Sequence, residues 1–232
     1  MAKTSSKGIN LEALHSVLLE VKWTVSSIRD KLVGLESKLE NVQNENAKLK
    51  QENQKFKSLM HTEYFRTDEL DQYSRRENVR IFGIPEDYTV EEDGKKQLLK
   101  LAGELNISLQ EKDIQRVHRL GKKKRSKAAK PRGIIARFVS YAKKQEFIEK
   151  RKKLKGTKIA VCEDLTSTRY KLYTYLQNHP NIQDAYVWNG AIKVSYKNTW
   201  YNIKNTDDLF QLNIDIKWKE LGVKLLADLH AE

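Results

Sequence analysis

Cysteine, long hydrophobic runs and clustered metal-binding side chains are scarce in this sequence. The single cysteine, Cys162, excludes an internal disulfide framework and suits a reducing compartment. No apolar run approaches the roughly 20 residues of a membrane-spanning helix, and residues 1–8 have no signal-peptide core. The five histidines are scattered, and none lies at metal-ligand spacing from Cys162 or from a second histidine. We therefore expect neither a membrane partner nor a metal site.

The sequence also lacks the motifs of common enzyme classes. Gly121-Lys122 has neither the upstream glycine nor the hydroxyl partner of a phosphate-binding loop, and there is no Gly-x-Ser-x-Gly elbow. The neighbouring carboxylates Glu163 and Asp164 end a predicted strand beside a helix cap, which favours a structural role over a catalytic one. We expect a protein that is not an enzyme and has no catalytic residues, no cofactor and no small-molecule substrate.

Charge, in contrast, is abundant and unevenly distributed. Charged residues make up 32% of the chain. The mean hydropathy of −0.72 indicates that part of the chain has little hydrophobic core of its own. The formal net charge is +13, and the segment from Arg116 to Lys155 alone holds 17 lysines and arginines against 2 glutamates. One basic segment of this size favours a polyanionic partner, RNA or single-stranded DNA, because only a polymer with many negative charges can bind so many cations at the same time.

Apolar residues recur with a seven-residue period from Leu11 onward, which predicts a coiled coil over residues 11–75 behind a disordered segment over residues 1–10. Leucine dominates heptad position a and β-branched residues take several d positions, which favours three or more strands; Asn46 and Asn53 at position a are also compatible with a dimer. The alternative is a single amphipathic helix that lies on a globular domain. The residues predicted to mediate oligomerisation are Leu14, Val21, Ile28, Leu32, Leu35, Leu39, Val42, Asn46, Leu49, Asn53 and Phe56.

Residues 76–164 show the order strand, helix, strand, strand, helix, strand, which predicts an RRM-like βαββαβ domain. The expected elements are strand 79–84, helix 91–105, strand 114–120, strand 134–140, helix 142–154 and strand 159–163. Period-two alternation directs Ile81 to the core, so that Arg80 and Arg137 point outward from neighbouring strands. An RRM usually carries stacking aromatic residues there. With arginine instead, the sequence predicts binding dominated by phosphate contacts, with weak sequence preference and a steep salt dependence.

A basic loop over residues 121–132 joins the second and third of these strands. It has two interpretations, a nucleic-acid contact or a solvated connection that serves as a nuclear localisation signal. The lysines of the following helix, such as Lys144, are expected to form a solvated face. The residues predicted to bind nucleic acid are Arg75, Arg76, Arg80, Arg116, Arg119, Lys122, Lys123, Lys124, Arg125, Arg132 and Arg137.

Residues 165–232 are predicted to form a small α+β domain that could provide one wall of a nucleic-acid groove. Thr166 can cap a helix that ends near Asn178, and Asn189-Gly190 between two β-rich runs is a strong hairpin signal. The tyrosines of that helix, Tyr170 among them, are expected in the core rather than on bases. A further strand over 200–204 precedes a helix start at Thr206, and no function is assigned to the residues after about 213.

Four motifs resemble one known family in their order and spacing. They are Arg76-Glu-Asn-Val-Arg-Ile-Phe-Gly-Ile-Pro-Glu86, Ile114-Gln-Arg-Val-His-Arg119, Pro131-Arg-Gly-Ile-Ile-Ala-Arg-Phe138, and Leu154-Lys-Gly-Thr-Lys158 followed by Glu163-Asp-Leu-Thr166. Together they resemble the first-open-reading-frame protein of LINE-type retrotransposons. The resemblance implies a trimeric coiled coil, an RRM, a small C-terminal domain, and activity as an RNA-coating nucleic acid chaperone. The C-terminal half is also similar to the baculovirus few-polyhedra protein.

The resemblance extends to individual positions. Arg137 matches an arginine of the third RRM strand that is central to RNA binding in the family, and Arg116 and Arg119 fall in its second basic motif. Residues 31–36 look like a trimer-specifying pattern, with Lys31 where arginine is expected. We thus expect a homotrimeric, RNA-binding protein in a cytoplasmic ribonucleoprotein. The open alternatives are a coiled-coil interaction scaffold, or a few-polyhedra-like viral protein, with a nuclear localisation signal.

Overall fold

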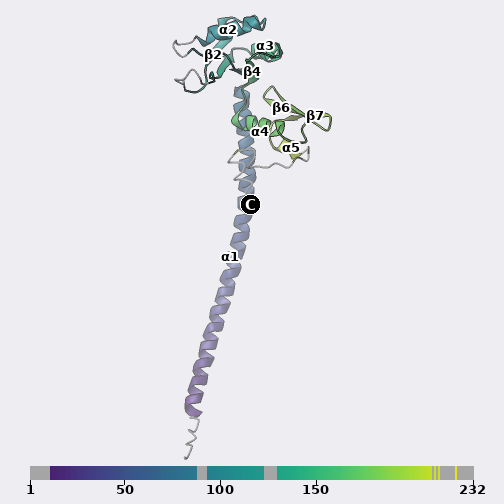
Figure 1. Cartoon of the computed structure of the whole chain (residues 1–232). Helices are drawn as coiled ribbons and strands as arrows, with labels where there is room; N and C mark the ends of the chain where they lie inside the picture. The colour runs from purple at the N-terminus through teal and green to yellow at the C-terminus, as the bar shows by residue number, and fades with distance from the viewer. Residues whose placement is uncertain are drawn as a thin grey trace, which may run out of the picture. The chain divides into compact units, whose positions relative to one another are not determined.

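The computed structural model describes residues 11–87, 93–122 and 130–210, together with residues 212, 214 and 223. The chain divides into two compact units, Met1–Leu59 and Met60–Glu232. A long N-terminal helix is followed by antiparallel sheets with shorter helices, so the expected α+β class is confirmed (Figure 1). The segment 1–10, expected to be disordered, lies outside the described residues.

Helix α1 runs from Leu11 to Ser74 without a proline. In the first unit every described residue is exposed except Ser27, which is half-buried. The apolar side chains expected to mediate oligomerisation are 48–62% exposed. Asn46 and Asn53 are exposed as well, and the Asn53 side-chain amide donates to the Leu49 carbonyl oxygen at 3.0 Å. This part of the helix therefore has an apolar stripe but no core of its own.

The last turns of α1 belong to the second unit and have two different faces. Phe65, Asp68 and Gln72 are buried against residues that follow in the chain. They occupy heptad positions b and f, which lie opposite the a and d positions. Met60 at position a and Leu70 at position d remain exposed. Burial of one face thus leaves the heptad stripe of the other face accessible.

The first sheet of the second unit has the strand order β2-β3-β1-β4, and all its neighbouring strands are antiparallel. Its elements are β1 (Asn78–Phe82), α2 (Gly94–Glu104), the 3-10 turn η1 (Glu111–Asp113), β2 (Ile114–Arg119), β3 (Ile134–Phe138), α3 (Tyr141–Lys150), the 3-10 turn η2 (Arg151–Leu154) and β4 (Ala160–Glu163). The expected succession of four strands and two helices is confirmed. Asp93 caps α2, because its carboxylate accepts hydrogen bonds from the backbone of Lys95 and Lys96.

One face of this sheet carries the core. Val79, Ile81, Ala136 and Phe138 are buried together with apolar side chains of α2 and α3. The alternation expected for β1 and β3 is therefore confirmed, since Arg80 is half-buried and Arg137 exposed on the other face. The helices α2 and α3 pack on the core face, because their buried side chains belong to the same apolar cluster as Val79 and Phe138.

A second sheet has the strand order β5-β6-β7. Its elements are α4 (Ser167–Gln177), β5 (Asp184–Trp188), β6 (Ala191–Tyr196), β7 (Thr199–Ile203) and the short helix α5 (Asp207–Phe210). The predicted hairpin is confirmed, because Trp188 pairs with Ala191 and the turn residues Asn189 and Gly190 have φ of 53° and 72°. The core of this sheet also includes Phe65 from α1.

Of the local predictions for α4, the helix cap is confirmed and the burial of Tyr170 is not. Thr166 caps α4, since its hydroxyl accepts from the Arg169 backbone at 3.2 Å, as predicted. The expectation that Tyr170 belongs to the core was wrong, because this side chain is 61% exposed. At the start of α5 the side chain of Asn205, rather than that of Thr206, accepts hydrogen bonds from the backbone of the first turn.

Candidate nucleic-acid interface

Arginines gather on the outward face of the first sheet through strand register. Arg116 of β2 lies opposite Arg137 of β3, which lies opposite Asn78 of β1. In the next row Ile135 lies between His118 of β2 and Arg80 of β1. We call Arg80, Arg116 and Arg137 the arginine face. Among the described strand residues that point to this side, none has a carboxylate.

Arg137, the central residue of this face, is partly neutralised from the sheet edge. One carboxylate oxygen of Glu77 lies 3.2 Å from Nη2 of Arg137, and the other lies 3.2 Å from Nη2 of Arg76. The Arg76 guanidinium also lies 4.0 Å from the centre of the Tyr73 ring. Because Arg137 and Arg76 are both exposed, these ion pairs are weak and can exchange for phosphate contacts.

Arg80 is held more firmly, by the buried carboxylate of Asp164. Its Nε donates to Asp164 Oδ1 at 2.5 Å, and the Asn78 amide donates to Oδ2 at 2.9 Å. Arg75 contacts the same carboxylate at 3.4 Å and also pairs with Asp71. The hydrogen bonding that the Arg75 guanidinium donates to the Asp71 carboxylate is the main cause that raises the pKa of Arg75. Arg75 and Arg80 are therefore fixed cations whose charge is already partly matched.

Arg116 and Lys122 are the most open of the predicted cations in the described part of the chain. Both side chains are exposed, and the Arg116 guanidinium makes no hydrogen bond or ion pair with any residue that the structure describes. The neighbouring predicted residues Lys123, Lys124 and Arg125 lie outside the described residues. Arg116 thus offers its full set of donors beside Arg137.

Arg119 and Arg132, in contrast, hold the chain together. Arg119 donates to the carbonyl oxygens of Ile84, Pro85 and Arg132 at 2.6–2.9 Å. Arg132 binds the Glu86 carboxylate through Nε at 2.8 Å, and this hydrogen bonding lowers the pKa of Glu86. Both guanidinium groups bind residues beyond the strand ends, so they stabilise the loops at the border of the arginine face.

Two buried ion pairs escaped sequence reasoning. Lys144, expected on a solvated surface, is buried and pairs with Glu163 at 3.2 Å, and burial lowers the pKa of Lys144. Glu163 also accepts from the backbone of Asn189 and Gly190 at 2.8 and 2.7 Å. The Glu163 carboxylate thus ties α3 to the β5–β6 turn.

The second buried pair joins α1 to α4. Arg169 Nε donates to Asp68 at 2.9 Å, its Nη1 donates to the Gly190 carbonyl oxygen at 2.6 Å, and its Nη2 binds Glu69. Nearby, the Gln72 side chain accepts from the Thr166 backbone and donates to the Asp164 carbonyl oxygen. The residues of α1 are 92 to 101 positions away from their partners Asp164, Thr166 and Arg169, so no local sequence signal could have identified these contacts.

Sequence reasoning also missed an aromatic residue on the outward side. Phe82 follows Arg80 by two residues and is 41% exposed. Its ring lies over Gly133 of the neighbouring chain segment, where an added Cβ would come within 2.7 Å of the ring. The period-two rule that placed Arg80 outward could have located Phe82 on the same side.

Other kinds of site find no support in the described ranges. No group of three or more histidine, cysteine, aspartate or glutamate side chains there could hold a metal ion. None of the helices described is both long enough and apolar enough to cross a membrane. Comparison with models of known protein families and with curated proteins gives no match.

Proposed function

We propose that this chain is a non-enzymatic protein that binds RNA or single-stranded DNA and associates with copies of itself. The observation that carries the proposal is the arginine face, on which three guanidinium groups share one side of a sheet and no described strand residue that points to that side has a carboxylate. Guanidinium groups bind phosphate with paired hydrogen bonds, and they also stack on bases. A row of them suits a flexible polyanion better than a small acidic ligand.

An RRM-like fold for residues 76–164 is part of the proposal. Its support is the connection order strand, helix, strand, strand, helix, strand together with the strand order β2-β3-β1-β4. In such a fold the two central strands expose the surface that binds single strands. Here the central strands are β3 and β1, which carry Arg137 and Arg80.

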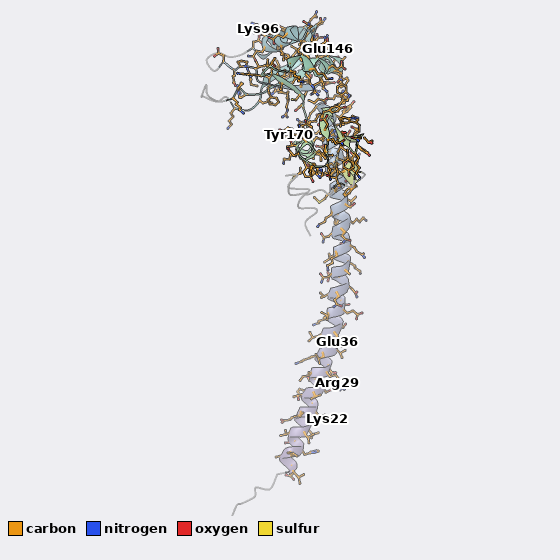
Figure 2. The ribbon with its side chains drawn as sticks, turned by 45° about the vertical axis from the view of Figure 1, so that its right-hand side comes forward. Lys22, Arg29, Glu36, Lys96, Glu146 and Tyr170 are labelled. Atoms are coloured by element: carbon orange, nitrogen blue, oxygen red, sulfur yellow. The ribbon has the colours of Figure 1, made fainter. Side chains whose placement is uncertain are left out.

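Self-association through a coiled coil, as a homotrimer, is the second part. Its support is the exposed heptad stripe of α1, because the first unit has no core of its own and heptad stripes are typically buried against the same stripe of another chain. Charged side chains flank the stripe: Lys22, Arg29 and Glu36, labelled on α1 in Figure 2, are spaced one heptad apart at position e. Several binding units on one rod would gain avidity without any new contact.

The resemblance to LINE-type first-open-reading-frame proteins suggests the biological context of this function. We infer a retrotransposon-type nucleoprotein with nucleic acid chaperone character, which coats RNA in a cytoplasmic ribonucleoprotein. The paired arginines support the chaperone character, since contacts that exchange readily between carboxylate and phosphate let a strand rearrange while bound.

The direct test replaces Arg137 with alanine and measures binding of a single-stranded oligonucleotide over a salt series. Each lost phosphate contact lowers the slope of log affinity against log salt by about 0.7 for a single strand, so we expect a decrease of that size. Arg66→Ala is the matched control, because Arg66 is an exposed arginine of α1 that pairs only with Glu63 among the described residues. An unchanged affinity and slope in Arg137→Ala would remove this residue from the interface.

Sedimentation of the full chain tests the second part. A homotrimer that binds the oligonucleotide at about 0.15 M salt is the expected result. Negligible binding by a self-associating chain would favour the interaction scaffold, with the basic loop as a nuclear import signal. A monomer that binds nothing would contradict both parts of the proposal.

A further inference from the structure

A cavity of about 650 Å³ opens beside the arginine face. Its lining includes Arg80 and Phe82 of β1, Arg151 of η2, Tyr170 and Tyr173 of α4, and Tyr186 of β5. All six residues belong to the second unit. The volume falls within the range of about 300–1,000 Å³ that is typical of pockets for small organic groups.

Four aromatic side chains, those of Phe82, Tyr170, Tyr173 and Tyr186, belong to the lining of this cavity. Phe82 and Tyr186 are each 41% exposed and Tyr170 is 61% exposed, so three rings have open surface. Tyr170, labelled in Figure 2, lies on the helix α4. The Tyr186 ring is held in place by an edge-to-face contact with Trp200, at 5.3 Å between centroids. Clustered exposed rings are costly on a soluble surface, and they commonly mark a binding site.

Cations border the same cavity. Arg80 belongs both to the arginine face and to the lining, and its guanidinium is fixed by Asp164. Arg151 lies on the lining from η2. Unpaired nucleic-acid bases stack on rings of this kind, and the adjacent arginines attract the phosphate backbone. An apolar ligand would need the rings but not the arginines.

We propose that this cavity receives unstacked bases of the strand whose phosphates contact the arginine face. This inference rests on the proposed function and deepens it, because it adds base contacts to an interface expected to depend on phosphate alone. The spacing in β1 supports it: Arg80 and Phe82 point to the same side, so a phosphate at Arg80 brings its neighbouring base to the Phe82 ring. A duplex keeps its bases stacked inside, and the cavity would therefore select single strands.

The test compares two strands of equal length and phosphate number, oligothymidylate and the same backbone with abasic spacers. The full-length protein should bind oligothymidylate about five- to a hundredfold more tightly, which corresponds to one stacked base. Tyr170→Ala should abolish this difference and leave the affinity for the abasic strand unchanged. Phe210→Ala is the matched control, because Phe210 is also 61% exposed but does not line the cavity.

A second readout separates a base contact from a general loss of structure. A strand that carries 2-aminopurine should lose fluorescence on binding as its base stacks on a ring, in the wild type and in Phe210→Ala but not in Tyr170→Ala. Equal wild-type affinity for the base-bearing and abasic strands would overturn the cavity proposal and leave the electrostatic function standing. No binding of either strand at low salt would overturn both.

Discussion

The two units of the molecule meet the demand for a hydrophobic core in different ways. The described part of the first unit, residues 11–59, is a single helix in which apolar residues recur every three or four positions and stay exposed. The second unit buries two apolar clusters and adds buried ion pairs between distant segments. The periodic sequence of the first unit therefore specifies an apolar stripe that its own helix cannot cover, whereas the alternating and turn-forming segments of the second unit enclose a core.

Removal of a buried charge in the second unit should have the largest effect. Arg169→Met leaves Asp68 buried without its partner, and we expect the free energy of unfolding to fall by about 3–5 kcal/mol. Chemical denaturation followed by tryptophan fluorescence measures the loss. The double variant Arg169→Met/Asp68→Leu removes both charges and should recover part of the stability. A loss below about 1 kcal/mol in the single variant would show that the ion pair is dispensable.

Truncation of a heptad residue should act only through assembly. Leu32→Ala is expected to weaken association by about 2–4 kcal/mol per chain, since a leucine side chain buried between helices would be lost. The neighbouring Val33 has similar exposure but lies off the stripe, so Val33→Ala should change stability by no more than about 0.5 kcal/mol. Sedimentation equilibrium and helix melting at two protein concentrations measure both. Equal effects of the two substitutions would argue against a seam at Leu32.

A cap in the second unit provides a smaller, local test. Thr166→Ala removes the hydroxyl that accepts from the Arg169 backbone at the start of α4, and should cost about 1 kcal/mol. Thr166→Ser keeps the hydroxyl and serves as the control. Because no oligomer contact is involved, the loss should not vary with protein concentration. A loss that does vary would place α4 in the assembly as well.

The smallest effect concerns pH. The pKa of Glu86 is lowered by its hydrogen bonds with Arg132, so the folded state favours the ionised carboxylate. Its contribution to stability is present above the ordinary glutamate pKa and is lost as pH falls below about 4. Denaturation at pH 7 and at pH 3 should show a smaller difference for Glu86→Gln than for the wild type. Identical differences would contradict this assignment.

The sequence predicted the parts of the fold that depend on short-range patterns. The alternation around Ile81 placed Arg80 outward, and Asn189-Gly190 predicted the hairpin, because in both cases the cause lies within a few residues. Other features depend on partners distant in the chain. Lys144 was expected in solvent because no residue near it in the sequence indicates its buried ion pair with Glu163.

The candidate site was predictable to a similar extent. The charge count found the basic segment but could not separate Arg116, which is open, from Arg119, which supports backbone carbonyls. The aromatic cavity was missed because its rings come from β1, α4 and β5, and only the folded chain brings these elements together. Tyr170 shows the difficulty, since an aromatic residue on a helix is more often buried than exposed.

The last turns of α1 combine a buried face, like the second unit, with an exposed apolar stripe, like the first unit. Phe65 and Asp68 face the core of the second sheet, while Met60 and Leu70 on the other side continue the heptad stripe. Each turn there contributes to intramolecular folding and, in the proposed trimer, to assembly. In the proposed trimer these shared turns would couple folding to assembly, and such coupling is reciprocal: a ligand that stabilises the C-terminal core would tighten the trimer, and dilution would weaken that core.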